Sequence, residues 1–235
     1  MQLFLSDLHL DSPQTPAFRT LCALLETERT RCSEIYFLGD LVEVWVGDDD
    51  DGPLAQAIMD LLAVTSRHCE VFIMHGNRDF LFGGSLAERT GTTLVEDPMP
   101  LGQDTLLAHG DSFCTDDLEY QQVRSTLRSE QWQQQILAMT LSQRRDLAAG
   151  MREQSRTANA NKPANIMDVN TVHVDELMRT MRRTVLIHGH THRPGVHEHS
   201  WGKRFVLGAW DRCGWLVRRS ADGCQLECFA LASNG

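Results

Sequence analysis

Five short segments of the sequence each bring together side chains that can ligate a metal ion or assist a reaction. They are SDLH (6–9), GDLVE (39–43), GNRD (76–79), HGD (109–111) and GHTH (189–192). Each follows a run of apolar residues that predicts a buried strand. Because strand ends on a rigid sheet can aim several side chains into one cleft, we expect the five segments to form one site.

The candidate metal ligands in these segments are carboxylates, imidazoles and one amide. They are Asp7, His9, Asp40, Asn77, His109, His190 and His192. This mixture suits divalent ions such as Mn²⁺, Fe²⁺ or Zn²⁺. Seven ligands exceed what one ion with an open position needs, and they suit two ions about 3.5–4 Å apart that share a carboxylate. The sequence therefore predicts a dinuclear centre, whereas we expect His75, His188 and His199 to be structural.

Short apolar runs that alternate with helical patterns must position these segments. We predict strands at 2–6, 35–38, 70–74 and 104–108, helices at 15–31 and 54–66, and further strands at 184–188, 204–207, 214–218 and 225–230. This alternation is typical of an α/β fold with a buried sheet. The length of 235 residues fits a single domain, 1–235, with an insertion.

The insertion is predicted at about 116–183, where strand signals vanish and apolar residues recur at helical spacing. This region holds ten Lys or Arg and nine Asp or Glu, a net charge of about +1. The whole chain carries −10, so the remainder carries about −11. The insertion therefore repels an anionic substrate less than the rest of the chain does. The alternative is that its helices carry mixed charge only because they are exposed to solvent.

Composition excludes several classes of protein. The acidic balance argues against a general nucleic-acid binder, and the sequence indicates no obligatory protein partner. No run approaches the ~18 uncharged apolar residues of a membrane span, and a cleaved leader would remove the first ligand segment, which begins at Ser6. The seven cysteines form no Cys-x-x-Cys pair, so we expect neither a disulfide framework nor a zinc ribbon, and a reduced, cytoplasmic location.

The five segments, in this order, resemble the calcineurin-like metallophosphoesterase superfamily over about 1–111 and 184–210. The resemblance implies a four-layer α/β/β/α sandwich around a dinuclear centre. By motif position, Asp7, His9, Asp40 and His192 would hold one cation. Asp40, Asn77, His109 and His190 would hold the other, with Asp40 as the bridge.

Arg78 departs from the superfamily pattern, which often has histidine after Gly-Asn as a proton donor to the leaving group. Arginine stays charged and cannot act as a general acid, but it can neutralise charge that develops on a phosphoryl group. A phosphate monoester that leaves from a diphosphate needs no proton, because its conjugate acid has a pKa of about 6. Arg78 therefore favours a diphosphate over an alkyl phosphodiester.

Longer stretches resemble one family within the superfamily, the bacterial UDP-2,3-diacylglucosamine pyrophosphohydrolases, over nearly the whole chain. They are GDLVEVWVGDDD (39–50), HGNRDFLFG (75–83), LAHGDSFCTDD (107–117), IMDVN (166–170) and HGHTHRP (188–194). The resemblance implies hydrolysis of UDP-2,3-diacylglucosamine to UMP and 2,3-diacylglucosamine 1-phosphate in lipid A biosynthesis. It also implies two Mn²⁺ ions, a metal-activated hydroxide that attacks the α-phosphorus, and peripheral binding at the cytoplasmic face of the inner membrane.

Family residues carried over by position give a catalytic set and a substrate-binding set. The catalytic set is Asp40, Asn77, Arg78, His109 and His190. The substrate-binding set is Asn77, Arg78, Asp117, Ser155, Asn159, Lys162 and His190. Asp117 can instead cap a helix together with Asp116, and Lys162 can be a solvated surface lysine.

Two further groups in or near the insertion have alternative interpretations. The apolar set Trp132, Ile136, Met139, Leu141, Leu147 and Met151 either lines a groove for acyl chains or packs the cap onto the core. Arg144, Arg145, Arg182 and Arg183 either lie near anionic lipid headgroups or are solvated, and the acidic run at 48–51 is expected to be a solvated loop. At the level of function, another dimetal phosphodiesterase or phosphatase and a non-catalytic scaffold of this fold remain alternatives.

Overall fold

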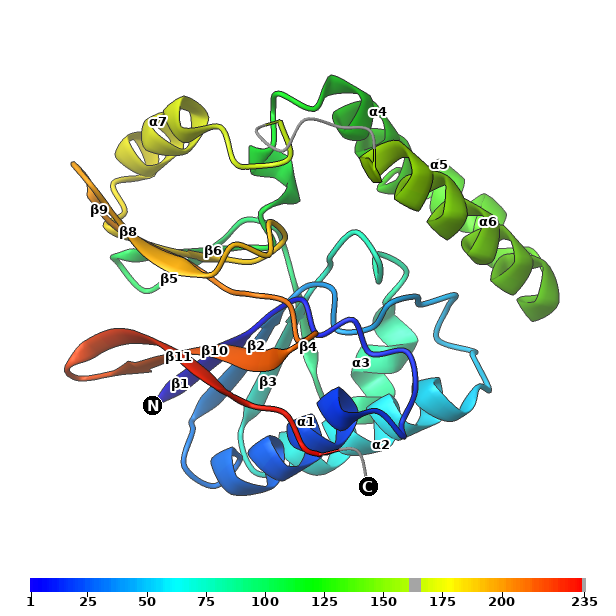
Figure 1. Cartoon of the computed structure of the whole chain (residues 1–235). Coiled ribbons are helices and arrows are strands. Elements are labelled where there is room, and N and C mark those ends of the chain that lie inside the picture. The colour runs from blue at the N-terminus through cyan, green and yellow to red at the C-terminus, as the bar shows by residue number, and fades with distance from the viewer. Residues whose placement is uncertain (161–165, 234–235) are drawn as a thin grey trace.

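The computed structural model describes residues 1–160 and 166–233, and the side chains of 159 and 160 are not part of that description. Within these residues the chain forms two mixed β-sheets that pack face to face (Figure 1). The first sheet has the order β11 (Gly223–Ala230), β10 (Cys213–Ser220), β1 (Gln2–Leu5), β2 (Glu34–Leu38), β3 (Glu70–Met74) and β4 (Thr93–Val95). The second has the order β5 (Met99–Leu101), β6 (Thr105–Ala108), β7 (Val185–His188), β9 (Gly202–Val206) and β8 (Gly195–His199).

Alternating side chains of the central strands explain why the two sheets stack. Leu3, Leu5 and Phe37 point away from the second sheet into a helix-covered core, whereas Phe4 and Tyr36 belong to the core between the sheets. Successive residues of a strand point to opposite faces, so fully apolar strands are buried on both sides. β1, β2 and β3 pair in parallel, which directs their carboxyl ends to one edge of the sheet.

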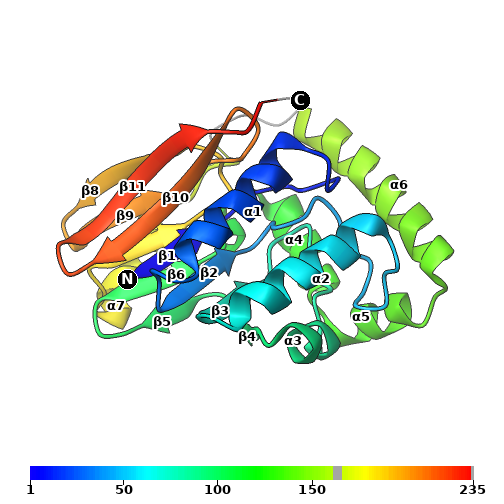
Figure 2. The same ribbon diagram turned by 90° about the horizontal axis from the view of Figure 1, so that it is seen from below.

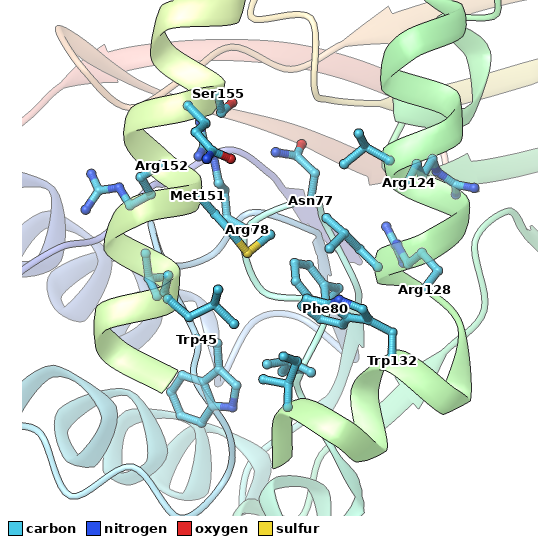
Figure 3. Close-up of a pocket in the computed structure, with 18 of the residues that line it drawn as sticks. Trp45, Asn77, Arg78, Phe80, Arg124, Arg128, Trp132, Met151, Arg152 and Ser155 are labelled. Atoms are coloured by element: carbon cyan, nitrogen blue, oxygen red, sulfur yellow. The ribbon is translucent and has the colours of Figure 1, made fainter. Parts of the chain in front are cut away.

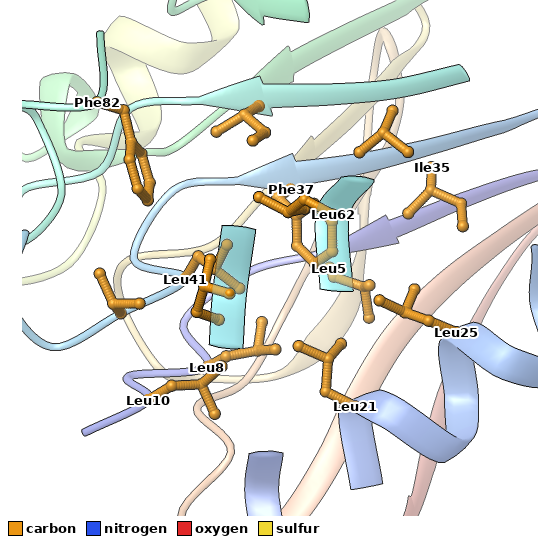
Figure 4. Packing of buried hydrophobic residues seen from close by; sticks show 14 of the residues in the cluster. Leu5, Leu8, Leu10, Leu21, Leu25, Ile35, Phe37, Leu41, Leu62 and Phe82 are labelled. Carbon is orange, nitrogen blue, oxygen red and sulfur yellow. The ribbon is translucent and has the colours of Figure 1, made fainter. Parts of the chain in front are cut away.

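Helices cover both outer faces, which confirms the expected four-layer α/β/β/α sandwich. α1 (Pro16–Glu28), α2 (Pro53–Ser66) and α3 (Gly84–Thr90) lie on the first sheet (Figure 2), where the leucines of α1 and α2 pack against its strands (Figure 4). α7 (Thr171–Met181) lies on the second sheet, where Val174 and Met178 pack against Leu106 and Leu186.

Three more helices extend beyond the sandwich along one side (Figure 1). They are α4 (Leu118–Leu127), α5 (Glu130–Leu137) and α6 (Leu141–Ala160), and we call them the cap. The helical insertion expected at 116–183 therefore serves two purposes, because α7 forms the outer layer of the sandwich and only α4–α6 form the cap. No helix among the described residues has the length and apolar character needed to cross a membrane.

The acidic run at 48–51 is a loop with Asp49 and Asp51 exposed, as expected, but its side chains also bind other segments, so it is solvated only in part. Asp48 accepts hydrogen bonds from the backbone N–H groups at the start of α3, and Asp49 pairs with Arg144 on α6. Arg145 pairs with both Asp50 and Asp51. Arg144 is only 3% exposed and also donates to the Val46 carbonyl at 2.5 Å, so it fastens the cap to the core and does not reach lipid headgroups.

Arg182 and Arg183, the other two arginines for which lipid contact was considered, lie at the end of α7, away from the cap. Arg182 is the C-cap of α7 and adopts a left-handed φ of 52°. Arg183 donates to the Gly102 carbonyl at 2.6 Å, next to the second sheet. All seven cysteines are free, as the sequence predicts.

Candidate metal centre and adjoining pocket

The five ligand segments follow β1, β2, β3, β6 and β7, all at the carboxyl ends of parallel strands. Hydrogen bonds between the loops join them: Asp7 N–H donates to the Gly39 carbonyl at 3.1 Å, and Gly189 N–H donates to the His109 carbonyl at 2.9 Å. Ligands in open α/β sheets gather at this edge. The structure therefore brings the seven predicted metal ligands together.

One group of ligands comprises Asp7, His9, His192 and Asp40. Nε2 of His9 lies 3.1 Å from Nε2 of His192, 3.9 Å from Asp7 Oδ1 and 3.7 Å from Asp40 Oδ2. Asp7 Oδ1 lies 3.5 Å from His192 Nε2. These distances suit side chains that share one cation at their centre.

The second group comprises Asn77, His109, His190 and the other oxygen of Asp40. Asn77 Oδ1 lies 3.1 Å from His109 Nε2 and 3.0 Å from His190 Nδ1. His109 Nε2 lies 3.8 Å from Asp40 Oδ1. The two oxygens of Asp40 thus face different groups, which is the arrangement expected of a bridging carboxylate.

Features of the protein alone test whether this donor set fits metal ions. Asp7 Oδ1 is buried and has no hydrogen-bond partner among the described residues, which is costly unless a cation balances it. His109 Nδ1 lies 2.9 Å from the Leu38 carbonyl, which can only accept, so Nδ1 carries a proton and Nε2 is the nitrogen that faces the site. The residues present therefore fit a dinuclear centre.

The backbone of the ligand loops is strained in a way that serves the site. The left-handed φ angles of ligand residues lie between 47° and 67°, at Asp7, His9, Asp40, His190 and His192. Such angles are uncommon for residues other than glycine and cost about 1–3 kcal/mol each, so the surrounding fold must impose them. Glycines make this packing possible, because a Cβ at Gly76 would lie 2.1 Å from Asp40 Oδ1 and one at Gly189 would lie 2.1 Å from Asp7 Oδ2.

Buried carboxylates make the protein around the site electronegative. Burial alone would lower the pKa of His109, but Asp40 and Asp111 raise it to about 9. Burial and the charge of Asp40 together raise the pKa of Asp79 to about 6. The negative charge of Asp40 contributes to both shifts, and negative charge at this place favours cation binding.

Glu43 is a residue at the site to which the sequence analysis assigned no role, although it lies within the second ligand segment. Its Oε2 lies 2.9 Å from His9 Nδ1, and its Oε1 lies 2.9 Å from Arg152 Nη2 on the cap. Arg78 Nη1 is 4.0 Å from the same Oε1. Burial would raise the pKa of Glu43, but the contacts with His9 and Arg78 lower it to about 2. A carboxylate on the far nitrogen of a ligating imidazole orients that ligand.

A second group without an assigned role links α4 to the site. Asp111 Oδ2 accepts from Tyr120 OH at 2.9 Å and from Arg124 Nε at 2.9 Å. Arg128 donates to the carbonyls of His75 and Gly76, beside the third ligand segment. Tyr120, Arg124 and Arg128 are spaced four apart in sequence, which puts them on one face of a helix. This spacing was the signal in the sequence that could have indicated a shared role.

A cavity of about 300 Å³ adjoins the metal centre between the cap and the core (Figure 3). Asn77, Arg78, Arg152 and Ser155 line one part of it, and the remainder is largely apolar. Four of the predicted groove residues line it, namely Trp132, Ile136, Leu147 and Met151. Met139 and Leu141 are not among the lining residues.

The predicted substrate contacts divide into three groups. Asn77, Arg78 and Ser155 line the cavity, and His190 lies 3.0 Å from Asn77 in the metal centre. Asp117 caps α4, accepting from Tyr120 N–H at 3.1 Å, while Asp116 accepts from Asn170. The side chain of Asn159 and the whole of Lys162 lie outside the described residues.

Comparisons with known proteins give the family of this chain. The family model for the calcineurin-like phosphoesterases matches residues 2–194. A UDP-2,3-diacylglucosamine hydrolase from Cellvibrio japonicus is 42% identical over 96% of this chain and 97% of its own length. The protein of the same name from Chromohalobacter salexigens is 43% identical over 94% of this chain and 93% of its own.

Solved structures with low sequence identity share the fold. A dimetal phosphatase from Danio rerio has a TM-score of 0.54 at 13% identity, covering 97% of this chain and 95% of that one. An archaeal phosphodiesterase has a TM-score of 0.50 at 11% identity, covering 97% and 99%. The chain therefore belongs to the calcineurin-like phosphoesterases and, within them, to the UDP-2,3-diacylglucosamine hydrolase family.

Proposed function

We propose that this protein hydrolyses the diphosphate bond of UDP-2,3-diacylglucosamine, releasing UMP and 2,3-diacylglucosamine 1-phosphate in lipid A biosynthesis. The observation that carries the proposal is the cavity, which begins at Asn77 and Arg78 beside the metal centre and continues as apolar surface under the cap. A substrate with a diphosphate and two acyl chains needs both features in one cavity. The names of the relatives support the same substrate.

Asp7, His9, Asp40 and His192 would hold one Mn²⁺, and Asp40, Asn77, His109 and His190 the other. When bound, the two cations supply a nucleophile from water at neutral pH and neutralise charge on the phosphoryl oxygens. Among ions that suit this mixed donor set, Mn²⁺ is our choice.

Arg78 lines the cavity with a permanent positive charge, and its Nε is buried without a hydrogen-bond partner among the described residues. It can therefore donate to a phosphoryl oxygen during in-line displacement at the α-phosphorus. The sugar 1-phosphate then leaves as an anion and needs no proton from the protein. Ser155, and beyond the described residues Asn159 and Lys162, are proposed contacts of the sugar and phosphate.

We further propose peripheral association with the cytoplasmic face of the inner membrane, where a lipid substrate resides. Exposed apolar side chains on the cap support it: Leu118 on α4 is 72% exposed, and Leu137 on α5 and Met139, which follows it, are also exposed. Exposed apolar groups of this kind bind at the boundary between headgroups and acyl chains.

Met151→Gln tests the apolar part of the cavity. Met151 lines the cavity from α6. A glutamine amide at this place would be dehydrated when an acyl chain binds, which costs about 1–3 kcal/mol of binding free energy. We expect KM for the diacylated substrate to rise about tenfold or more, with little change in kcat. Ala149→Gln places the same side chain on the exposed face of α6 and is the matched control. Equal KM values for the two variants would contradict acyl binding at this surface.

A substrate panel tests the reaction itself. Metal-stripped protein is assayed with and without MnCl₂ for release of UMP from UDP-2,3-diacylglucosamine, and in parallel with a simple alkyl phosphodiester and a phosphoprotein. We expect turnover of the diphosphate alone, and only with the metal. Faster turnover of the diester or of the phosphoprotein would favour another dimetal phosphodiesterase or phosphatase, and no turnover by protein shown to bind two Mn²⁺ would favour a scaffold.

A further inference from the structure

His188, the last residue of β7, lies beneath the junction of two ligand loops. Its side chain is fully buried. A Cβ at Gly110 would lie 2.8 Å from His188 Nδ1, so the ring packs directly against the loop that follows His109. The same Nδ1 lies 2.9 Å from the carbonyl of Gly189, the residue that precedes His190. One imidazole therefore supports loops that carry ligands of both groups.

The two polar neighbours of His188 leave only one arrangement of its protons. The Gly189 carbonyl can only accept, so Nδ1 must donate. Nε2 lies 3.4 Å from Nη1 of Arg204, a guanidinium that can only donate, so Nε2 must accept. A neutral ring with its proton on Nδ1 is the single form that satisfies both contacts.

Arg204 is held by a further imidazole. It is 7% exposed, and within 1–160 and 166–233 no carboxylate lies at ion-pair distance from it. Its Nε lies 3.4 Å from His199 Nε2, and His199 Nδ1 lies 3.0 Å from Asp175 Oδ1 on α7. Asp175 thus requires the proton of His199 on Nδ1 and leaves Nε2 to accept from Arg204. Trp201 fixes this end, since it donates to the same oxygen at 2.7 Å and stacks on His199.

We propose that Asp175, His199, Arg204 and His188 form a relay of positioning residues for the metal centre. The relay begins at α7, crosses β8 and β9, and ends at the Gly189 carbonyl. It acts on His190, which adopts a φ of 67° and whose N–H donates to Asp7 Oδ2 at 2.9 Å. The relay holds the Gly189 peptide so that His190 keeps this disfavoured backbone, and with it the position of its Nδ1 beside Asn77.

None of the four residues contacts the ligand atoms, so their effect is on metal affinity rather than on a chemical step. Groups that orient metal ligands from behind commonly change metal affinity by about 10–100-fold when they are replaced. The inference rests on the metal centre proposed above. It assigns a role to His188, which is not among the metal ligands predicted from the motifs.

The test compares His188→Asn with His188→Gln. An asparagine amide reaches the place of Nδ1 and keeps a donor for the Gly189 carbonyl. A glutamine amide reaches the place of Nε2, keeps an acceptor for Arg204 and loses that donor. Isothermal titration of metal-stripped protein with MnCl₂ gives the affinities, and urea unfolding of the metal-free variants reports whether each is folded. His68→Gln, in the exposed turn after α2, is the matched control.

We expect Mn²⁺ affinity within about threefold of wild type for His188→Asn and a loss of about 10–100-fold for His188→Gln. Should the substitutions at His188 prevent folding, Asp175→Asn and Asp175→Ala test the far end. The asparagine oxygen can still accept from His199 and Trp201, so only the alanine variant should weaken binding. An equal loss of Mn²⁺ affinity in the two variants at one position would show that the residue serves only packing, and it would overturn the proposal. Wild-type Mn²⁺ affinity in both variants would overturn it as well. Wild-type protein that binds no Mn²⁺ would instead contradict the metal centre, and the relay with it.

Discussion

Asp40→Asn is expected to abolish turnover, with kcat for UDP-2,3-diacylglucosamine falling by more than about 1000-fold, the upper range for one lost electrostatic partner. The two oxygens of Asp40 face different ligand groups, 3.7 Å from His9 Nε2 and 3.8 Å from His109 Nε2. A neutral amide can offer one weak oxygen ligand, so the bridge is lost. Steady-state assays at saturating MnCl₂, with metal content measured on the same sample, check the result.

The fold should survive this substitution. Asp40 Oδ1 accepts the Arg78 N–H at 2.8 Å, and an amide oxygen can keep that bond. Loss of this buried negative charge relieves repulsion with Asp79 but also removes an attraction to His109, and the two effects oppose each other in metal-free protein. We therefore expect a melting temperature close to that of wild type without metal. Asp60→Asn on the exposed face of α2 serves as the control, and activity of Asp40→Asn within tenfold of that control would contradict the bridging role.

Arg78→Ala is expected to lower kcat by about 100–1000-fold with a smaller change in KM, because its charge acts most strongly as charge develops in the transition state. Arg78→Lys should recover only part of the loss, since an ammonium does not reproduce the planar donors of a guanidinium. Arg156→Ala is the control, because Arg156 lies on the exposed part of α6, where it pairs with Glu153. Rates are compared under single-turnover conditions.

The choice of leaving group separates charge stabilisation from proton donation. If Arg78 serves a leaving group that needs no proton, the wild type should cleave diphosphates far faster than alkyl diesters. Arg78→His introduces a group that can donate a proton to the leaving group. This variant should therefore show a smaller ratio of the diphosphate rate to the alkyl diester rate than wild type. A preference unchanged in Arg78→His, together with wild-type activity in Arg78→Ala, would show that Arg78 takes no part.

The metal ligands could be predicted from sequence because each is tied to a strong local pattern. β1, β2, β3, β6 and β7 are short apolar runs, and each is followed at once by its ligand segment. Parallel strands put their carboxyl ends at one edge, so local order along the chain determines the shared site. β4, β5 and β8 were not predicted, because they have only three to five residues and lie at sheet edges with mixed exposure.

Contacts between distant segments could not be predicted in the same way. The acidic run at 48–51 has the composition of a solvated loop, and its partners Arg144 and Arg145 lie about 95 residues away. Glu43 is the last residue of the second ligand segment, GDLVE, but nothing in the local sequence indicates that it contacts both His9 and Arg152 of the cap. The helical pattern of α7 is the same whether it joins the cap or covers a sheet, so its place depends on tertiary packing.

The most direct test of the proposed reaction is hydrolysis of UDP-2,3-diacylglucosamine with MnCl₂ in ¹⁸O-labelled water, with the products resolved by mass. Attack at the α-phosphorus predicts one labelled oxygen in UMP and none in the 2,3-diacylglucosamine 1-phosphate. Label in the sugar phosphate would contradict the site of attack, and the absence of both products from protein that holds two Mn²⁺ would contradict the proposed function.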